Sequence, residues 1–117
     1  MKYKKISSNP IATLLQIVGA KWKLLIIQAL LKKEMRFSEL KKALGCTSRI
    51  LQINLTELAQ DGLVVREEDL SEPNRVEYYL TDIGYTLKPV IDTMEKWGKD
   101  YKRLKKLMEK YSKIQEM

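Results

Sequence analysis

The side chains best suited to chemistry share one helix face, which carries Ser48, Arg49, Gln52, Ile53 and Thr56. Their spacing brings them to one side of a helix. Arg49 can donate two hydrogen bonds to a guanine edge, and Gln52 can pair with an adenine in the same way. Ile53 suits contact with a thymine methyl group. The pattern suits the reading of base edges in duplex DNA, although in an isolated helix a solvated polar face on a buried helix is the commoner explanation.

The start of this helix adds groups that can hold a phosphate. Thr47 and Ser48 stand where the helix is expected to begin. Free backbone N–H groups at a helix N-terminus attract anions, and hydroxyl side chains can add hydrogen bonds to a phosphate. We therefore expect these two residues to fix the helix on the DNA backbone.

The helix that positions this face is predicted over residues 47–61. Its other side is apolar, with an inward stripe of Leu51, Leu55 and Leu58. Gly62 supplies a C-terminal stop. A shorter helix is predicted over residues 38–44 with Ser38 as its N-cap, and Gly45 makes the turn between the two helices. Two helices joined in this way form a helix-turn-helix.

A hairpin is predicted directly after the second helix. Residues 63–68 read as a strand, residues 71–74 have turn chemistry, and residues 75–80 alternate apolar and polar side chains. Asn74 and Arg75 stand near the tip, where they can reach a minor groove or a phosphate. The alternative for Arg75 is a cross-strand ion pair with Glu67 or Glu68. The hairpin shifts the balance for the preceding helix face toward base recognition.

Two helices are predicted upstream of this unit. Asn9 can cap a helix that has Pro10 at its first position, and a second helix over residues 20–33 is apolar almost all round, which is typical of a central helix. Residues 36–37 form a short extended link, a candidate for a minimal first strand. Basic side chains in this part can contact backbone phosphates, and they are Lys21, Lys23, Arg36, Lys41 and Lys42.

A C-terminal helix is predicted after Thr81, which caps it, with a break near residues 87–89. Its apolar side chains exceed what one small domain can cover, so we expect a second copy to cover them. The predicted dimer interface combines Ile11, Leu14, Leu15, Met94, Trp97, Tyr101 and Leu104. The alternative is packing within one chain. Trp22, Trp97 and Tyr101 could also line a pocket for a small-molecule effector, although such aromatic residues commonly form plain core.

Composition limits the classes of function. The chain has 117 residues and a net charge of +7, which we interpret as a single domain, with a core over residues 9–98 and a basic helical extension over residues 99–117. Residues 1–49 hold eleven Lys or Arg against two Glu, whereas residues 66–77 hold two Arg against five acidic residues. A basic half suits contact with a polyanion, and the alternative is solubility alone.

Catalytic and metal chemistry find little support in the residue types. The sequence has no His, no Gly-rich phosphate loop and no carboxylate pair at a suggestive spacing, so we expect neither an enzyme nor a cofactor or metal. Cys46, the single cysteine, lies beside the helix N-terminus and is a candidate redox sensor, with a small turn-filling residue as the alternative. No apolar run approaches the roughly 20 residues that span a bilayer. We expect a cytoplasmic protein without a cleaved signal peptide or a membrane partner.

The ordered set of short motifs resembles the HxlR family of bacterial winged-helix transcriptional regulators, which are related to the MarR type. The matching segments are residues 19–23, 36–40, 51–64, 75–78, 80–84 and 97–98. The resemblance implies a homodimer, built from the first helix and the C-terminal helices, that binds an inverted repeat upstream of its target genes. Many members carry a cysteine just before the proline that opens the first helix, and in some it senses electrophiles or disulfide stress. This chain has Asn9 there, so that mechanism is not transferred.

The sequence thus predicts a mainly α fold with a small β-hairpin wing (α+β), a winged helix-turn-helix with N-terminal and C-terminal dimerisation helices. The predicted function is a sequence-specific DNA-binding transcriptional regulator, a repressor or an activator. The 47–61 helix would enter the major groove and the 66–80 hairpin would act as the wing. The alternative is a winged-helix module that binds protein, without specific DNA binding.

Overall fold

The computed structural model describes residues 5–69, 71–72 and 75–116. The helices are α1 (Pro10–Val18), α2 (Lys21–Lys32), α3 (Phe37–Leu44), α4 (Ser48–Gln60), α5 (Asp82–Tyr85) and α6 (Lys88–Glu116). The strands are β1 (Met35–Arg36), β2 (Val64–Glu68) and β3 (Val76–Leu80). The chain forms two compact units, Met1–Thr86 and Leu87–Met117. Helices α1 to α5 and the strands belong to the first unit, and α6 belongs to the second.

The core of the first unit gathers around α2, as its apolar sequence predicted. Ile26, Ile27 and Leu30 are at most 1% exposed. Leu40 of α3 and the α4 stripe Leu51, Leu55 and Leu58 are equally buried. Each such side chain contributes about 1.5–3 kcal/mol when it leaves water. The burial of the leucine stripe fixes which face of α4 points outward.

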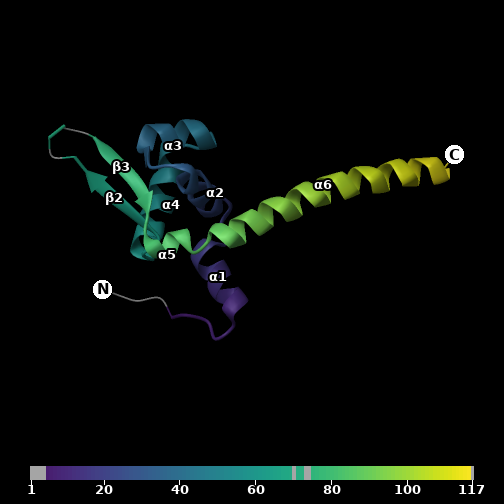
Figure 1. Ribbon diagram of the computed structural model, residues 1–117, viewed down its shortest axis with the longest axis horizontal. Helices are drawn as coiled ribbons and strands as arrows, with labels where there is room; N and C mark the ends of the chain where they lie inside the picture. The colour runs from purple at the N-terminus through teal and green to yellow at the C-terminus, as the bar shows by residue number, and fades with distance from the viewer. Residues whose placement is uncertain (1–4, 70, 73–74, 117) are drawn as a thin grey trace. The chain divides into compact units, whose positions relative to one another are not determined.

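The strands form one antiparallel sheet in the order β1-β3-β2. In the register, Val64 lies opposite Leu80 and Arg66 opposite Tyr78, while Met35 of β1 also pairs with Tyr78. Figure 1 shows β2 and β3 as a long hairpin that projects from the helices of the first unit. The predicted minimal first strand exists, although it ends at Arg36, since Phe37 already begins α3.

The N-termini of α1 and α3 show which of the predicted helix caps are correct. Asn9 caps α1, because its Oδ1 accepts hydrogen bonds from the N–H groups of Ile11 and Ala12. The predicted cap of α3 at Ser38 is wrong: α3 begins at Phe37, and its N-cap is Arg36. The Glu39 carboxylate accepts a hydrogen bond from the Arg36 N–H at 3.0 Å, which is the contact that the third helical residue makes with the N-cap in a capping box.

Two glycines end the helices of the helix-turn-helix. Gly45 follows α3 with a φ of 68°, and Gly62 follows α4 with a φ of 80°. Residues other than glycine rarely adopt this left-handed backbone conformation. Glycine therefore permits the sharp chain reversals at these two points. The predicted stop at Gly62 is confirmed, and it sends the chain directly into β2.

Thr81 joins the end of the helix-turn-helix to α5. Its hydroxyl donates a hydrogen bond to the Gly62 carbonyl at 2.6 Å and accepts one from the Gly84 N–H at 3.1 Å. The predicted cap at Thr81 is confirmed. Helix α5 ends at Tyr85 and α6 starts at Lys88, so the predicted break near residues 87–89 also exists.

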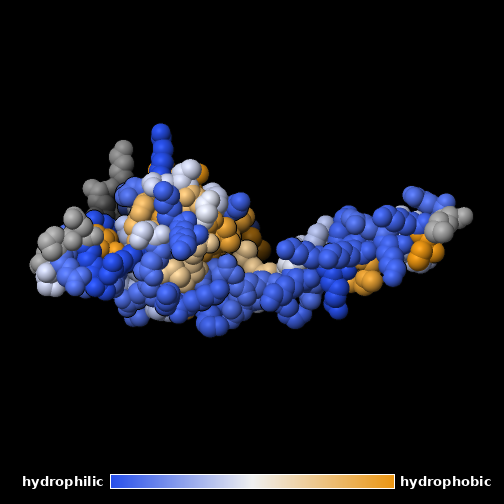
Figure 2. Space-filling model, turned by 90° about the horizontal axis from the view of Figure 1, so that it is seen from above, coloured by the Kyte–Doolittle hydropathy of each residue, from blue (hydrophilic) through white to orange (hydrophobic). Residues whose placement is uncertain are grey.

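The second unit is the 29-residue helix α6. Figure 2 shows its surface as mostly hydrophilic with separate hydrophobic patches. The exposed apolar side chains of α6 are Met94, Trp97, Tyr101, Leu104, Leu107, Met108, Tyr111 and Ile114. The rings of Trp97 and Tyr101 stack with centroids 5.2 Å apart.

Within the described residues, no single helix is long and apolar enough to cross a membrane. Helices α1 and α2 satisfy the length and composition test only as a pair, which is bent by 83°. The apolar side chains of α2 already have a place in the protein core.

Candidate nucleic-acid interface

The outward face of α4 carries the polar residues that the sequence singled out. Ser48, Arg49, Gln52 and Thr56 are exposed, and Ile53 is 47% exposed. An exposed isoleucine between polar neighbours gives this face an apolar contact point. The structure therefore brings all five residues of the predicted DNA-facing helix face to one surface of the first unit.

Thr47 holds the start of α4. Its Oγ1 accepts a hydrogen bond from the Ile50 N–H at 3.1 Å. A hydroxyl that accepts in this way still has its own proton to donate. Thr47 can therefore stabilise the helix and contact a phosphate at the same time, which is compatible with its predicted role.

An ion pair ties α4 to the central helix. The Lys23 Nζ lies 2.5 Å from the Glu57 carboxylate, and the Lys23 side chain is only 8% exposed, compared with 46% for Glu57. The predicted phosphate contact of Lys23 is therefore wrong, because its charge is used inside the first unit. Its periodicity among apolar residues of α2 explains the burial, since its aliphatic stem packs with the core. The pair helps to fix the orientation of α4.

Two shallow grooves flank Gln52. One has a volume of about 360 Å³ and includes Gln52, Thr56, Arg66 and Tyr78 in its lining. The other has a volume of about 410 Å³ and includes Arg36, Ser38, Gln52, Arg66 and Tyr78. Gln52 and Arg66 line both grooves, so the helix face, the start of α3 and the hairpin meet around them.

Arg66 is a candidate contact residue that the sequence patterns did not single out. It lies on β2, is exposed, and forms an ion pair with Glu68 at 2.7 Å. Its hydrogen bond to Glu68 raises the pKa of Arg66 above its ordinary value, so the guanidinium stays charged. In the sequence it is merely one of two cations in an acidic segment. The useful signal was its register opposite Tyr78, which turns it toward the grooves beside α4.

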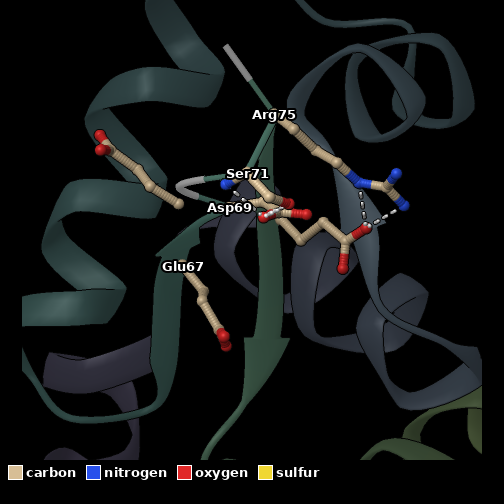
Figure 3. Close-up of a pocket in the computed structure, with 6 residues that line it drawn as sticks. Glu67, Asp69, Ser71 and Arg75 are labelled. Carbon is tan, nitrogen blue, oxygen red and sulfur yellow. Dashed lines mark hydrogen bonds and ion pairs between the residues drawn. The ribbon is translucent and has the colours of Figure 1, made fainter. Parts of the chain in front are cut away.

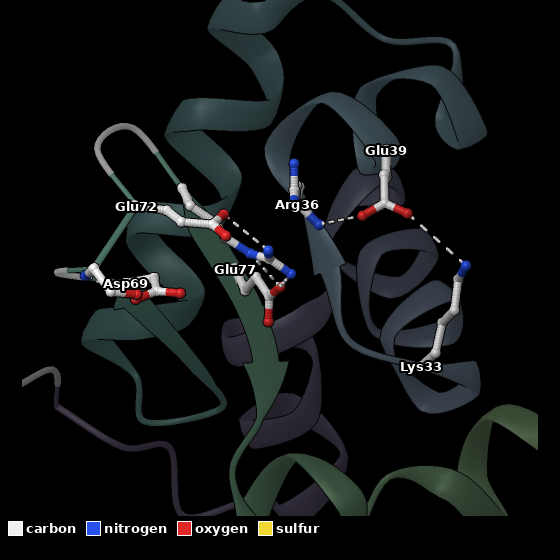
Figure 4. Close-up of polar contacts among 8 residues, drawn as sticks. Lys33, Arg36, Glu39, Asp69, Glu72 and Glu77 are labelled. Carbon is white, nitrogen blue, oxygen red and sulfur yellow. Dashed lines mark hydrogen bonds and ion pairs between the residues drawn. The ribbon is translucent and has the colours of Figure 1, made fainter.

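Arg75 has partners within its own hairpin. Its guanidinium contacts Glu72 at 3.0 Å and Glu77 at 3.0 Å. The alternative of a cross-strand pair with Glu67 or Glu68 is wrong about the partners, although an ion pair does form. Figure 4 labels Glu72 and Glu77, the two residues whose carboxylates this guanidinium contacts. The other predicted tip residue, Asn74, lies outside the described residues.

The outer surface of the hairpin is acidic. A cleft of about 580 Å³ is lined by Glu67, Glu68, Asp69, Ser71, Arg75 and Glu77. Figure 3 shows Glu67, Asp69, Ser71 and Arg75 around it. Hydrogen bonds from Ser71 lower the pKa of Asp69, so its carboxylate stays ionised. These carboxylates disfavour phosphates, so Arg66, which lines the grooves beside α4, is the better candidate of the hairpin for contact with DNA.

Arg36, directly before α3, also lines this interface. Figure 4 shows that the Glu39 carboxylate meets the Arg36 backbone N–H and the Lys33 ammonium. Neither contact involves the Arg36 guanidinium. The Arg36 side chain is exposed and lines the groove beside Gln52. Its predicted role as a phosphate contact agrees with this position.

The remaining predicted sites are the dimer interface, the effector pocket and the redox-sensing cysteine. In α1, Ile11 and Leu15 are exposed and Leu14 is half-buried. In α6, Met94, Trp97, Tyr101 and Leu104 are exposed. The dimer interface and the effector pocket, which also needs Trp22, stay predictions. Cys46 is a free thiol that is buried, and its redox role likewise stays a prediction. Among the described residues no cluster of His, Cys, Asp or Glu could hold a metal ion.

Several known proteins are similar to this chain in sequence and in fold. The HTH-type transcriptional regulator YdeP of Bacillus subtilis is 43% identical over 100 residues, which cover 84% of this chain and 78% of YdeP. The solved structure of the redox regulator HypR in its reduced form has a TM-score of 0.78 and 33% identity, and the match covers 84% of this chain and 98% of that one. The reduced transcriptional regulator YodB from B. subtilis has a TM-score of 0.70 and 28% identity, covering 79% of this chain and 91% of YodB.

The family comparison covers most of the chain. The model described as HxlR-like helix-turn-helix matches residues 17–106, which include every element from α2 to β3 and most of α6. The predicted winged-helix fold and family are confirmed. The chain belongs to the HxlR-like helix-turn-helix family of DNA-binding transcriptional regulators.

Proposed function

We propose that this protein is a sequence-specific transcriptional regulator that reads its operator with the exposed face of α4. The observation that carries the proposal is the division of α4 into a buried leucine stripe and an exposed face with Arg49, Gln52 and Ile53. Such a face fits the major groove, where a bidentate side chain distinguishes one base pair from another by about 1–3 kcal/mol. Arg36 and Arg66, on either side of Gln52, would contact the backbone.

We further propose that the protein acts as a homodimer on an inverted repeat. The exposed apolar residues of α1 and α6 support this step, because apolar surfaces of this extent commonly mark interfaces. Two-fold symmetry would set two copies of α4 about one DNA turn apart, or about 34–36 Å. Each copy would then read one half-site.

Binding to the protein's own upstream DNA tests the reading role. We expect Arg49→Ala to lose the preference for operator over scrambled duplex, while Lys32→Ala removes the same charge from an exposed site outside the interface and keeps it. Loss of one bidentate contact corresponds to roughly 1–3 kcal/mol of discrimination. Equal preference in wild type and Arg49→Ala would remove Arg49 from base recognition.

Salt dependence separates the proposal from the alternative of a protein-binding module. A DNA regulator that neutralises several phosphates loses affinity steeply as salt rises, because counterions are released on binding. Weak, sequence-independent binding of the wild-type protein at every salt concentration would favour the protein-binding alternative.

Sedimentation tests the interface. Trp97→Ala should weaken the dimer because it removes a ring that is 66% exposed in one chain. Tyr85→Ala is the matched control, since it removes another exposed ring outside the predicted interface. An unchanged mass for Trp97→Ala, at concentrations where the wild type begins to dissociate, would contradict the interface.

A further inference from the structure

Helix α6 carries a continuous row of basic side chains. The row alternates steps of three and four residues and consists of Lys96, Lys99, Arg103, Lys106, Lys110 and Lys113. All six side chains are exposed, and α6 is helical throughout this stretch. Four acidic residues lie in or beside this stretch, Glu95, Asp100, Glu109 and Glu116, and Asp100 contacts two members of the row. The row is therefore a predominantly basic side of the helix, with an excess of positive charge.

Six of the eight exposed apolar residues of α6 follow the same alternation on the other side, while Leu107 and Ile114 lie four residues after Arg103 and Lys110, beside the basic row. The row of six is Met94, Trp97, Tyr101, Leu104, Met108 and Tyr111, which precedes the basic row by two residues at each step. A shift of two residues turns the helix by about 200°. The basic row thus lies opposite the apolar row, so covering the apolar row with a second copy leaves the basic row facing outward.

The length of the row suits a polyanion with closely spaced charges. From Lys96 to Lys113 a helix rises about 26 Å, and duplex DNA carries about 15 phosphates over the same distance. The first half of the row is partly neutralised, because Asp100 contacts Lys96 at 2.7 Å and Arg103 at 3.6 Å. The unneutralised charge is therefore concentrated toward Lys106, Lys110 and Lys113.

We propose that the basic row of α6 is a second, sequence-independent DNA contact that binds backbone phosphates of the duplex flanking the operator. This inference rests on the proposed function, since it needs the first unit to select the operator. Two members of the row, Lys110 and Lys113, lie beyond residue 106, where the family match ends.

The test compares two duplexes and three full-length proteins. One duplex holds only the operator, and the other extends it by about 10 base pairs, one DNA turn, on each side. The row variant is K106Q/K110Q/K113Q, and glutamine preserves helix propensity. The control K5Q/K32Q/K102Q removes the same number of charges from exposed residues outside the row. Circular dichroism and sedimentation check whether each variant keeps the helicity and mass of the wild type.

We expect the wild type and the control to bind the extended duplex more tightly than the short one. The row variant should lose most of this gain and keep its preference for operator over scrambled DNA. The slope of log K against log salt on the extended duplex should fall by about 0.9 for each phosphate that the row variant no longer neutralises.

Equal gains from flanking DNA in the row variant and the control would overturn the inference. Binding of the wild type, but not of the row variant, to vesicles of anionic phosphatidylglycerol, without any flank effect on DNA, would assign the row to a lipid surface instead. Failure of the proposed function looks different, because operator and scrambled duplex would then bind the wild type equally.

Discussion

The ion pair between Lys23 and Glu57 leads to a prediction about stability that differs for its two members. Lys23 lies on α2 and is almost fully buried, whereas Glu57 lies on α4 and keeps nearly half of its side-chain surface in water. Removing the carboxylate leaves a buried ammonium without its partner, whereas removing the ammonium leaves a carboxylate that water can still reach. We therefore expect Glu57→Gln to cost more than Lys23→Met.

The exposed fractions of the two side chains set the expected loss in the free energy of unfolding for each variant. Breaking a fully buried pair by removing one partner costs about 3–5 kcal/mol, and an exposed pair is worth about 0–1 kcal/mol. The 8% exposure of Lys23 and the 46% exposure of Glu57 place Glu57→Gln between these limits, at about 2 kcal/mol. Lys23→Met keeps the aliphatic stem that packs with the core, so its cost should stay below about 1 kcal/mol.

Denaturant unfolding of four proteins measures the difference. They are the wild type, the two single variants and the double variant Lys23→Met/Glu57→Gln, which should resemble Lys23→Met because no stranded charge remains. Glu34→Gln, an exposed carboxylate, is the control and should lie within about 0.5 kcal/mol of the wild type. Equal costs for the two single variants, or a larger cost for Lys23→Met, would refute the idea that a stranded ammonium dominates.

Two further perturbations follow from local geometry. Gly84→Ala should destabilise the protein by about 1–3 kcal/mol, because its Cβ would overlap the Leu63 carbonyl oxygen; Gly98→Ala, which has open space, should leave the unfolding midpoint unchanged or raise it. A hydrogen bond from Lys96 lowers the pKa of Asp100, so its stabilising effect on α6 is complete above the unfolded pKa of about 3.9 and is lost as pH falls through the lower folded value. Far-UV circular dichroism should show a smaller acid-side loss of helicity in Asp100→Asn, and an identical loss would contradict this assignment.

Local signals in the sequence were enough to predict most of the fold. Asn9 before Pro10, Gly62 after a leucine stripe and Thr81 before a short helix are signals whose meaning depends on neighbouring residues alone. The outward face of α4 was predictable for the same reason, because a helix that buries Leu51, Leu55 and Leu58 must expose the opposite side. These features needed no knowledge of distant contacts.

The errors concern side chains whose roles depend on distant parts of the chain. Lys23 looked like a surface cation because its partner lies 34 residues later, on another helix. Arg66 was overlooked because its position beside α4 follows from strand register. The cap at Ser38 failed because the N-cap lies two residues earlier, at Arg36, whose backbone N–H donates a hydrogen bond to the Glu39 carboxylate. Charge alone does not tell whether a basic residue is used inside the protein or faces a partner.

The distribution of cations bears on how the proposed operator complex would gain its affinity. Arg66 and Arg75, the described cations of the hairpin, already have carboxylate partners, and the outer side of the hairpin is acidic. Contact of these arginines with phosphate requires exchange of one anionic partner for another, which yields less than the neutralisation of an unpaired cation. The hairpin would then contribute mainly to orientation, while non-specific affinity would have to come from cations elsewhere. Arg36 beside α4 and the basic row of α6 are among the groups that can supply this charge, so the salt dependence of binding should respond more to the row than to Arg75.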